Sequence, residues 1–169
     1  MFKPGDVVMQ EKTMVNKLNF KDNKKDRLSI VLFNFKENDK IYYATVPITN
    51  ITKTNHYKIL SNNYLYMPYS ILNDTKLCCA KIDSIYLYGE NSLTKTDINI
   101  NEHTLMILFK KILTIEVEDY QKELYDFIKI MINDHMDRCA SKEKQEKKKR
   151  LKERKEKRKI LKQSYKNNK

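Results

Sequence analysis

The sequence has no long apolar run, and this absence narrows the choice of function. Its unbroken apolar stretches are only a few residues long, such as Leu105–Phe109. A membrane-spanning helix needs about 20 apolar residues, and the core of a secretion signal needs about 7–15. We therefore expect neither a membrane-spanning segment nor a signal peptide.

Cysteine and histidine are scarce as well. The three cysteines include the adjacent pair Cys78 and Cys79, which forms neither a disulfide framework nor a zinc-binding spacing. His135 and Cys139 lie four residues apart, which suits one helix face, but two ligands do not complete a metal site. No histidine is placed beside a nucleophile as a catalytic triad would need. The sequence predicts no cofactor, no metal and a reducing cytoplasm.

Charge is abundant but unevenly distributed. The segment 141–169 holds 15 Lys or Arg residues against 4 Glu, so it carries +11 of the total formal charge of +12. The first 140 residues are therefore close to neutral, and 169 residues suit one domain with an appendage. The basic character belongs to the tail, where it favours a polyanionic partner.

The first half of the chain is typical of short strands. Apolar, β-branched and aromatic residues are concentrated in segments bounded by turn residues, and Asn38-Asp39 predicts a hairpin turn. No helical pattern separates these segments, which favours a small antiparallel barrel or sandwich over a parallel α/β sheet. The predicted strands are Asp6–Gln10, Arg27–Phe35, Lys40–Ile48, His56–Leu60, Tyr64–Met67 and Lys76–Tyr88.

Helical spacing begins after Thr96. Asn101 is a predicted N-cap for a first helix, and a second amphipathic helix follows over residues 117–131. The second helix packs either on its own domain or on a second subunit. From Ser141 onward the apolar stripe is lost, but acid-first pairs four residues apart predict an exposed helix. These pairs are Glu143 with Lys147, Glu146 with Arg150, and Glu153 with Lys157.

Three early features occur in a suggestive order. Gly5-Asp6 opens the first predicted strand, Arg27 begins the second, and Val46-Pro47-Ile48-Thr49-Asn50 closes the third. In this order and placement the features resemble the MazF/PemK family of bacterial toxins, over about residues 2–115.

The resemblance implies both a fold and an activity. The fold would be α+β and mainly β: an SH3-like antiparallel barrel over 1–115, an amphipathic helix over 116–140, and a long basic helical or disordered tail over 141–169. The activity would be metal-independent cleavage of single-stranded RNA by a homodimer that a cognate antitoxin silences. Arg27 and Thr49 would be the catalytic residues.

Both residue types suit that chemistry. Attack by a 2′-hydroxyl on the adjacent phosphate develops negative charge, which a forked guanidinium stabilises while a hydroxyl positions or relays a proton. Residues expected to contact RNA are Lys21, Lys24, Lys25, Asn50, Lys53 and Lys81.

The sequence also departs from the family pattern. Leu28 follows Arg27 where the family has proline, residues 11–26 contain no glycine, and Lys81-Ile82-Asp83 replaces Gln-Ile-Arg. An alternative interpretation is therefore a catalytically silent barrel that binds RNA or protein. In that case Arg27 pairs with an acid such as Asp26, the loop lysines are simply solvated, and the tail serves solubility or tethers nucleic acid without sequence preference.

Overall fold

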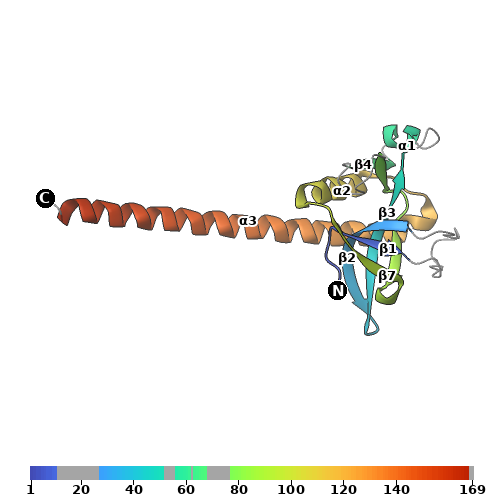
Figure 1. The fold of residues 1–169 in the computed structure, drawn as a ribbon, viewed down its shortest axis with the longest axis horizontal. Coiled ribbons are helices and arrows are strands. Elements are labelled where there is room, and N and C mark those ends of the chain that lie inside the picture. The colour runs from blue at the N-terminus through green and yellow to red at the C-terminus, as the bar shows by residue number, and fades with distance from the viewer. Residues whose placement is uncertain (11–26, 52–55, 62, 68–76, 168–169) are drawn as a thin grey trace. The chain divides into compact units, whose positions relative to one another are not determined.

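The structure, a computed structural model, describes residues 1–10, 27–51, 56–61, 63–67 and 77–167 (Figure 1). The chain divides into two compact units, Met1–Lys129 and Ile130–Lys169. The first unit is a mixed α+β domain built around a mostly antiparallel seven-stranded sheet. The second unit consists of the remainder of the last helix.

The described strands all come before the two long helices in the chain. The strands are β1 (Asp6–Gln10), β2 (Arg27–Glu37), β3 (Lys40–Asn50), β4 (Tyr64–Met67), β5 (Cys78–Lys81), β6 (Tyr86–Gly89) and β7 (Leu93–Asn99). The helices are α1 (His56–Leu60), the 3₁₀ turn η2 (Glu90–Ser92), α2 (Glu102–Thr114) and α3 (Asp119–Asn167).

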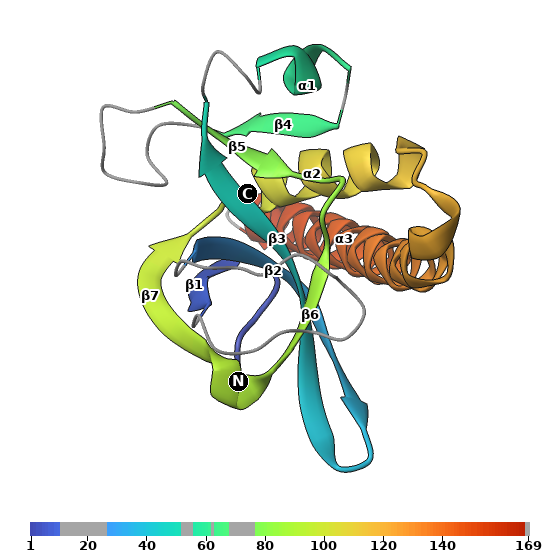
Figure 2. The same ribbon diagram turned by 90° about the vertical axis from the view of Figure 1, so that its right-hand side faces the viewer.

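Local chemistry explains how the first strands begin and turn. Gly5 has φ of +92°, and a Cβ there would lie 3.1 Å from the Ile100 carbonyl oxygen, so only glycine fits. The turn of the β2–β3 hairpin is formed by Asn38 and Asp39, with φ of 47° and 61°. Two successive left-handed residues match the twist of a two-residue hairpin. Figure 2 shows this hairpin projecting away from β4 and β5. The predicted turn is confirmed.

The sheet is an open path rather than a closed barrel. Its strands pair in the order β4-β5-β3-β2-β1-β7, and β6 pairs beside β5 on the same strand, β3. Within the described residues no pairing joins β4 to β7, so the closed barrel expected from the sequence is not seen. The short strands β5 and β6 share β3 end to end, because β3 is long enough to pair with both.

Three other expectations need correction. The segment His56–Leu60 is the short helix α1, in which Lys58 pairs with Asp83 (Nζ to Oδ2, 3.6 Å). The strand expected over Lys76–Tyr88 is two strands, because the chain turns between Lys81 and Tyr86. The strand β7 was not expected, since its mostly polar residues join β1 through backbone pairing.

The core lies on both faces of the sheet. One face carries a cluster of buried side chains: Phe2, Val8, Val31, Tyr43, Tyr86, Tyr88 and Leu93. On the other face, Phe127 of α3 packs edge-on against Phe33 and Phe35 of β2, with ring centroids 6.3 and 5.4 Å apart. The Tyr125 hydroxyl donates to the Ile82 carbonyl at 2.6 Å. The start of α3 therefore packs on its own domain, which decides between the two alternatives left by the sequence.

The helix α2 begins as its sequence predicts. Asn101 caps it, because its Oδ1 accepts a hydrogen bond from the Thr104 amide at 2.8 Å. Its buried stripe consists of Leu105, Leu108, Phe109 and Ile112.

In the second unit, two of the predicted acid-first pairs form. Lys147 Nζ lies 2.7 Å from Glu143 Oε1, and Arg150 Nη2 lies 3.9 Å from Glu146 Oε2. The third predicted pair, Glu153 with Lys157, is not among the ion pairs of the described residues. No helix in the described part of the chain is both long and apolar enough to cross a membrane.

Candidate functional site

The two candidate catalytic residues stand at neighbouring strand ends. Arg27 is the first residue of β2, and Thr49 is the penultimate residue of β3. The β2–β3 ladder ends with Ser29 opposite Pro47. Beyond that pair, Arg27 pairs with Gln10 of β1, and Thr49 pairs with Cys79 of β5. Both residues therefore stand at the same end of the β2–β3 ladder, each two residues beyond its last pair.

This pair lies at the margin of the face that carries the core cluster. Because side chains alternate along a strand, Arg27 shares its face with Val31, and Thr49 shares its face with Tyr43. Val31 and Tyr43 are fully buried, whereas Arg27 and Thr49 are half-buried. Arg27 and Thr49 therefore lie at the boundary between the buried core and the solvent.

A group of buried polar side chains lies between this margin and the core. Gln10 Nε2 donates to Thr45 Oγ1 at 2.9 Å. Among the described residues, Gln10 Oε1, Ser29 Oγ and Ser92 Oγ have no hydrogen-bond partner. Gln10 stands directly opposite Arg27 in the β1–β2 ladder, and Ser29 is two residues from Arg27 on the same face. Buried polar atoms without partners are uncommon, and catalytic sites are among the places that retain them. Sequence reasoning did not identify this group.

Removal of the Ser29 hydroxyl and removal of the Thr45 hydroxyl should change the free energy of unfolding in opposite directions. Ser29→Ala deletes a buried hydroxyl without a described partner, so we expect the free energy of unfolding to rise by about 1 kcal/mol. Thr45→Val leaves the Gln10 amide without its acceptor, so we expect a fall of about 1–3 kcal/mol. Urea denaturation of both variants at one pH measures the difference. Equal destabilisation by both variants would contradict this assignment.

A row of paired residues runs across the sheet from Thr49 to an exposed aromatic residue. Thr49 pairs with Cys79 of β5, and Cys79 pairs with Tyr66 of β4. Two strand spacings of about 4.8 Å therefore separate Thr49 from Tyr66, or about 10 Å in all. The Tyr66 side chain is 44% exposed. The row thus joins a hydroxyl and an aromatic ring, and the Arg27 guanidinium belongs to the end of the adjacent strand β2.

Cys79, the middle residue of this row, is not accessible to solvent. Both Cys78 and Cys79 are fully buried. Neighbouring residues of a strand point to opposite faces, so both faces of β5 are covered. Burial, reinforced by the neighbouring Cys78, raises the pKa of the Cys79 thiol to about 11.

A small cationic and aromatic cluster flanks the row. Lys58 Nζ and Lys81 Nζ lie 5.1 and 5.8 Å from the centre of the Tyr64 ring. Burial and the nearby Asp83 carboxylate raise the pKa of Tyr64. Burial alone would lower the pKa of Lys58, but the charge of Asp83 and the contact with Tyr64 raise it overall. Lys58 is therefore a firmly cationic group here that the sequence did not suggest.

The other predicted RNA contacts are only partly placed. Asn50 is exposed at the end of β3, opposite Cys78, and Lys81 is half-buried at the end of β5. Lys21, Lys24, Lys25 and Lys53 lie outside the described residues, as does Asp26, the alternative partner of Arg27. These assignments stay predictions.

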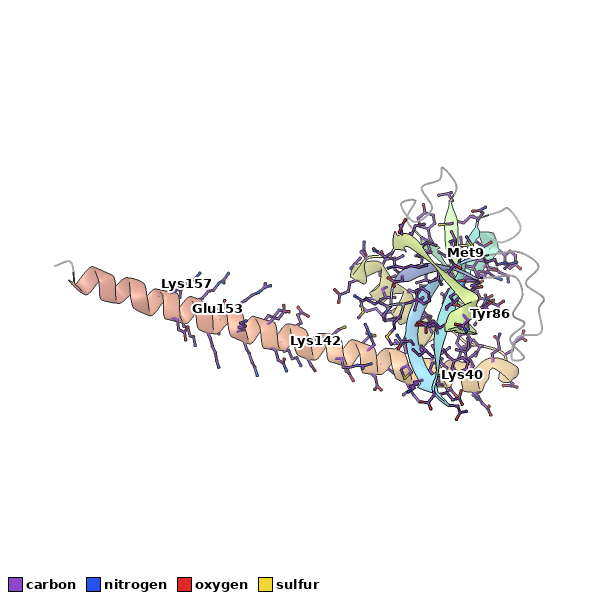
Figure 3. The ribbon with its side chains drawn as sticks, turned by 60° about the horizontal axis from the view of Figure 1, so that its bottom comes forward. Met9, Lys40, Tyr86, Lys142, Glu153 and Lys157 are labelled. Atoms are coloured by element: carbon purple, nitrogen blue, oxygen red, sulfur yellow. The ribbon has the colours of Figure 1, made fainter. Side chains whose placement is uncertain are left out.

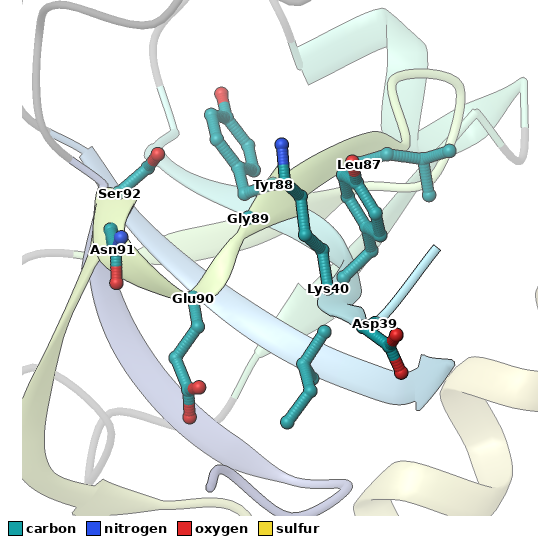
Figure 4. A pocket seen from close by; sticks show the side chains of 10 residues that line it. Asp39, Lys40, Leu87, Tyr88, Gly89, Glu90, Asn91 and Ser92 are labelled. Carbon is teal, nitrogen blue, oxygen red and sulfur yellow. The ribbon is translucent and has the colours of Figure 1, made fainter. Parts of the chain in front are cut away.

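An open pocket of about 480 Å³ lies elsewhere on the first unit (Figure 4). It is lined by residues 39–42 of the hairpin and 87–92 of β6 and η2. At its edge Glu90 accepts a hydrogen bond from the Tyr43 hydroxyl at 3.0 Å and lies 3.4 Å from the amino terminus. Thr49 lies eight positions after Ile41 of the pocket on β3, or about 27 Å along the strand. The pocket is therefore separate from the candidate site.

In the described part of the chain, no three His, Cys, Asp or Glu side chains are grouped as a metal ion would need. Cys139 Sγ lies 3.5 Å from His135 Nε2 in the second unit, which is a contact of two residues. Neither a protein-family model nor a curated protein matches this chain.

Proposed function

We propose that this protein is an endoribonuclease that cleaves single-stranded RNA without a metal ion, as a toxin silenced by an antitoxin. The observation that carries the proposal is the position of Arg27 and Thr49, both half-buried, at the same end of the β2–β3 ladder. The order of Gly5-Asp6, Arg27 and Thr49 along the sequence supports it. An open SH3-like arrangement of the strands, working as a homodimer, belongs to the same proposal.

The reaction assigns a role to each residue. The 2′-hydroxyl of the nucleotide attacks the adjacent phosphorus, forming a 2′,3′-cyclic phosphate and breaking the bond to the 5′-oxygen of the next nucleotide. Arg27 stabilises the charge that develops on the phosphoryl oxygens. Thr49 orients the attacking hydroxyl and relays its proton toward the leaving 5′-oxygen, so the proton count is unchanged.

The remainder of the row supplies binding. The exposed Tyr66 offers a ring on which a neighbouring base stacks, a contact worth about 1–3 kcal/mol in single-strand binding. Lys58 and Lys81 add positive charge beside it. The backbone of the RNA strand would then cross β3 and β5, with the scissile phosphate between Arg27 and Thr49.

The decisive test is cleavage of a long single-stranded RNA in the presence of EDTA. We expect cleavage to continue at an unchanged rate, giving fragments that end in 2′,3′-cyclic phosphate and begin with a 5′-hydroxyl. Loss of cleavage in EDTA and its return with Mg²⁺ would contradict the proposed chemistry. Binding of RNA with no cleavage in either condition would favour the alternative, a catalytically silent binding module.

A further inference from the structure

The charged side chains of α3 are segregated around the helix axis. From residue 141 to residue 158 every side chain is exposed. With about 100° between successive residues, the four glutamates fall within a sector of about 140°. They are Glu143, Glu146, Glu153 and Glu156. The remaining sector, here called the cationic face, contains no acidic residue.

The two sides of the helix therefore differ in net charge. The sector that holds the glutamates, here called the balanced side, also bears four basic residues. They are Lys142, Lys149, Arg150 and Lys157. Each of these is balanced by one glutamate. The cationic face bears Lys144, Lys147, Lys148, Lys152, Arg154, Lys155 and Arg158. Of these, Lys147 hydrogen-bonds to Glu143 at the border and lowers the pKa of that carboxyl. Figure 3 labels Lys142, Glu153 and Lys157 of the balanced side.

We propose that the cationic face binds the phosphodiester backbone of nucleic acid. From Lys144 to Arg158 the face forms a straight track about 21 Å long. Such a track matches a regular line of phosphates, and each contact releases a counterion. No aromatic residue lies between positions 141 and 158, so base stacking does not contribute. The face consequently has no sequence preference.

Other partners fit this face less well. A helix that lies on a membrane needs an apolar side, whereas Leu151 is the sole large apolar side chain among residues 141–158. A stable protein interface is centred on buried aromatic or arginine anchors surrounded by apolar contacts. One leucine, 57% exposed, supplies no such centre.

The test compares two matched variants of the full chain. One variant replaces Lys144, Lys148, Lys155 and Arg158 of the cationic face with glutamine. The control variant replaces Lys142, Lys149, Arg150 and Lys157 of the balanced side with glutamine. Each loses three lysines and one arginine, so net charge falls equally. Glutamine keeps a helix propensity close to that of lysine, and circular dichroism verifies the helix content.

Binding is measured by fluorescence anisotropy with a labelled 30-nucleotide 2′-O-methyl oligouridine. This probe has no free 2′-hydroxyl, so binding is measured whether or not the proposed cleavage occurs. We expect the salt dependence of the cationic-face variant to fall by about 3 in log–log slope, and that of the control by less than about 1. Between 50 and 200 mM salt, wild-type affinity should then fall about 50-fold more than that of the cationic-face variant.

Three outcomes would overturn the proposal. Equal losses in the two variants would mean that only net charge matters. A preference above tenfold for the RNA analogue over a DNA strand of the same length and sequence, or the reverse, would contradict a backbone mode. Displacement of the probe by polyglutamate as effectively as by unlabelled probe would indicate an acidic protein as the partner.

Discussion

Replacing Arg27 with alanine should lower the single-turnover rate of RNA cleavage by about 10²–10³-fold. Removing one donor that stabilises a developing oxyanion costs about this much in well-studied enzymes. Arg27→Lys keeps the charge but loses the forked donors, so most of the loss should remain. The measurement is the rate of fragment formation with enzyme in excess over RNA.

The matched control for this loss is Arg138→Ala. Arg138 is exposed in the second unit, where its Nε donates to the Asp134 carbonyl. Its replacement with alanine removes one positive charge, as Arg27→Ala does. We expect this variant to cleave at the wild-type rate. Thermal unfolding of both variants verifies that they are folded. An Arg27→Ala protein that is folded and fully active would exclude the proposed mechanism.

Replacing Thr49 with valine should reduce the same rate by about 10²–10⁴-fold, the range typical of a group that handles protons. Valine has nearly the same shape and suits a strand, so the fold should be unaffected. Because the hydroxyl acts on the reacting atoms, the affinity for uncleavable RNA should change little. The loss should therefore appear in the rate of the chemical step.

Thr94→Val is the control for this change, since Thr94 is an exposed β7 residue outside the candidate row. A Thr49→Val protein that loses affinity for the uncleavable analogue in proportion to its rate would assign Thr49 to binding. An unchanged rate would remove Thr49 from the mechanism altogether.

Features that depend on a few neighbouring residues could be predicted from the sequence. Asn38-Asp39 forms the hairpin turn and Asn101 caps α2 because their short polar side chains suit these backbone positions. The strands β1, β2 and β3 were found near their true bounds because apolar residues dominate them.

Features that depend on distant residues could not be predicted. The short helix α1 forms where Lys58 meets Asp83, which is 25 positions later in the chain. The strand β7 is held by backbone pairing with β1, about 90 residues earlier, so its own side chains carry little strand signal. Likewise, the hydrogen bond between Gln10 and Thr45 spans 35 positions.

The candidate site also combines features that could be predicted from the sequence with features that depend on distant residues. Arg27 and Thr49 could be named from their order along the chain, but their place at the same end of the β2–β3 ladder follows from the strand register, in which Ser29 and Pro47 form the last pair. Tyr66 joins the row only because β5 lies between it and Thr49. No local pattern in the sequence marks that tyrosine as part of a site.

The buried thiols of β5 have a consequence for the conditions in which such a site can work. Thiolates, not thiols, react with oxidants and disulfides. With a pKa of about 11 and no exposed surface, Cys79 stays protonated and shielded at neutral pH. The Cys79 thiol beside Thr49 is therefore a poor target for oxidants and for disulfide exchange at neutral pH.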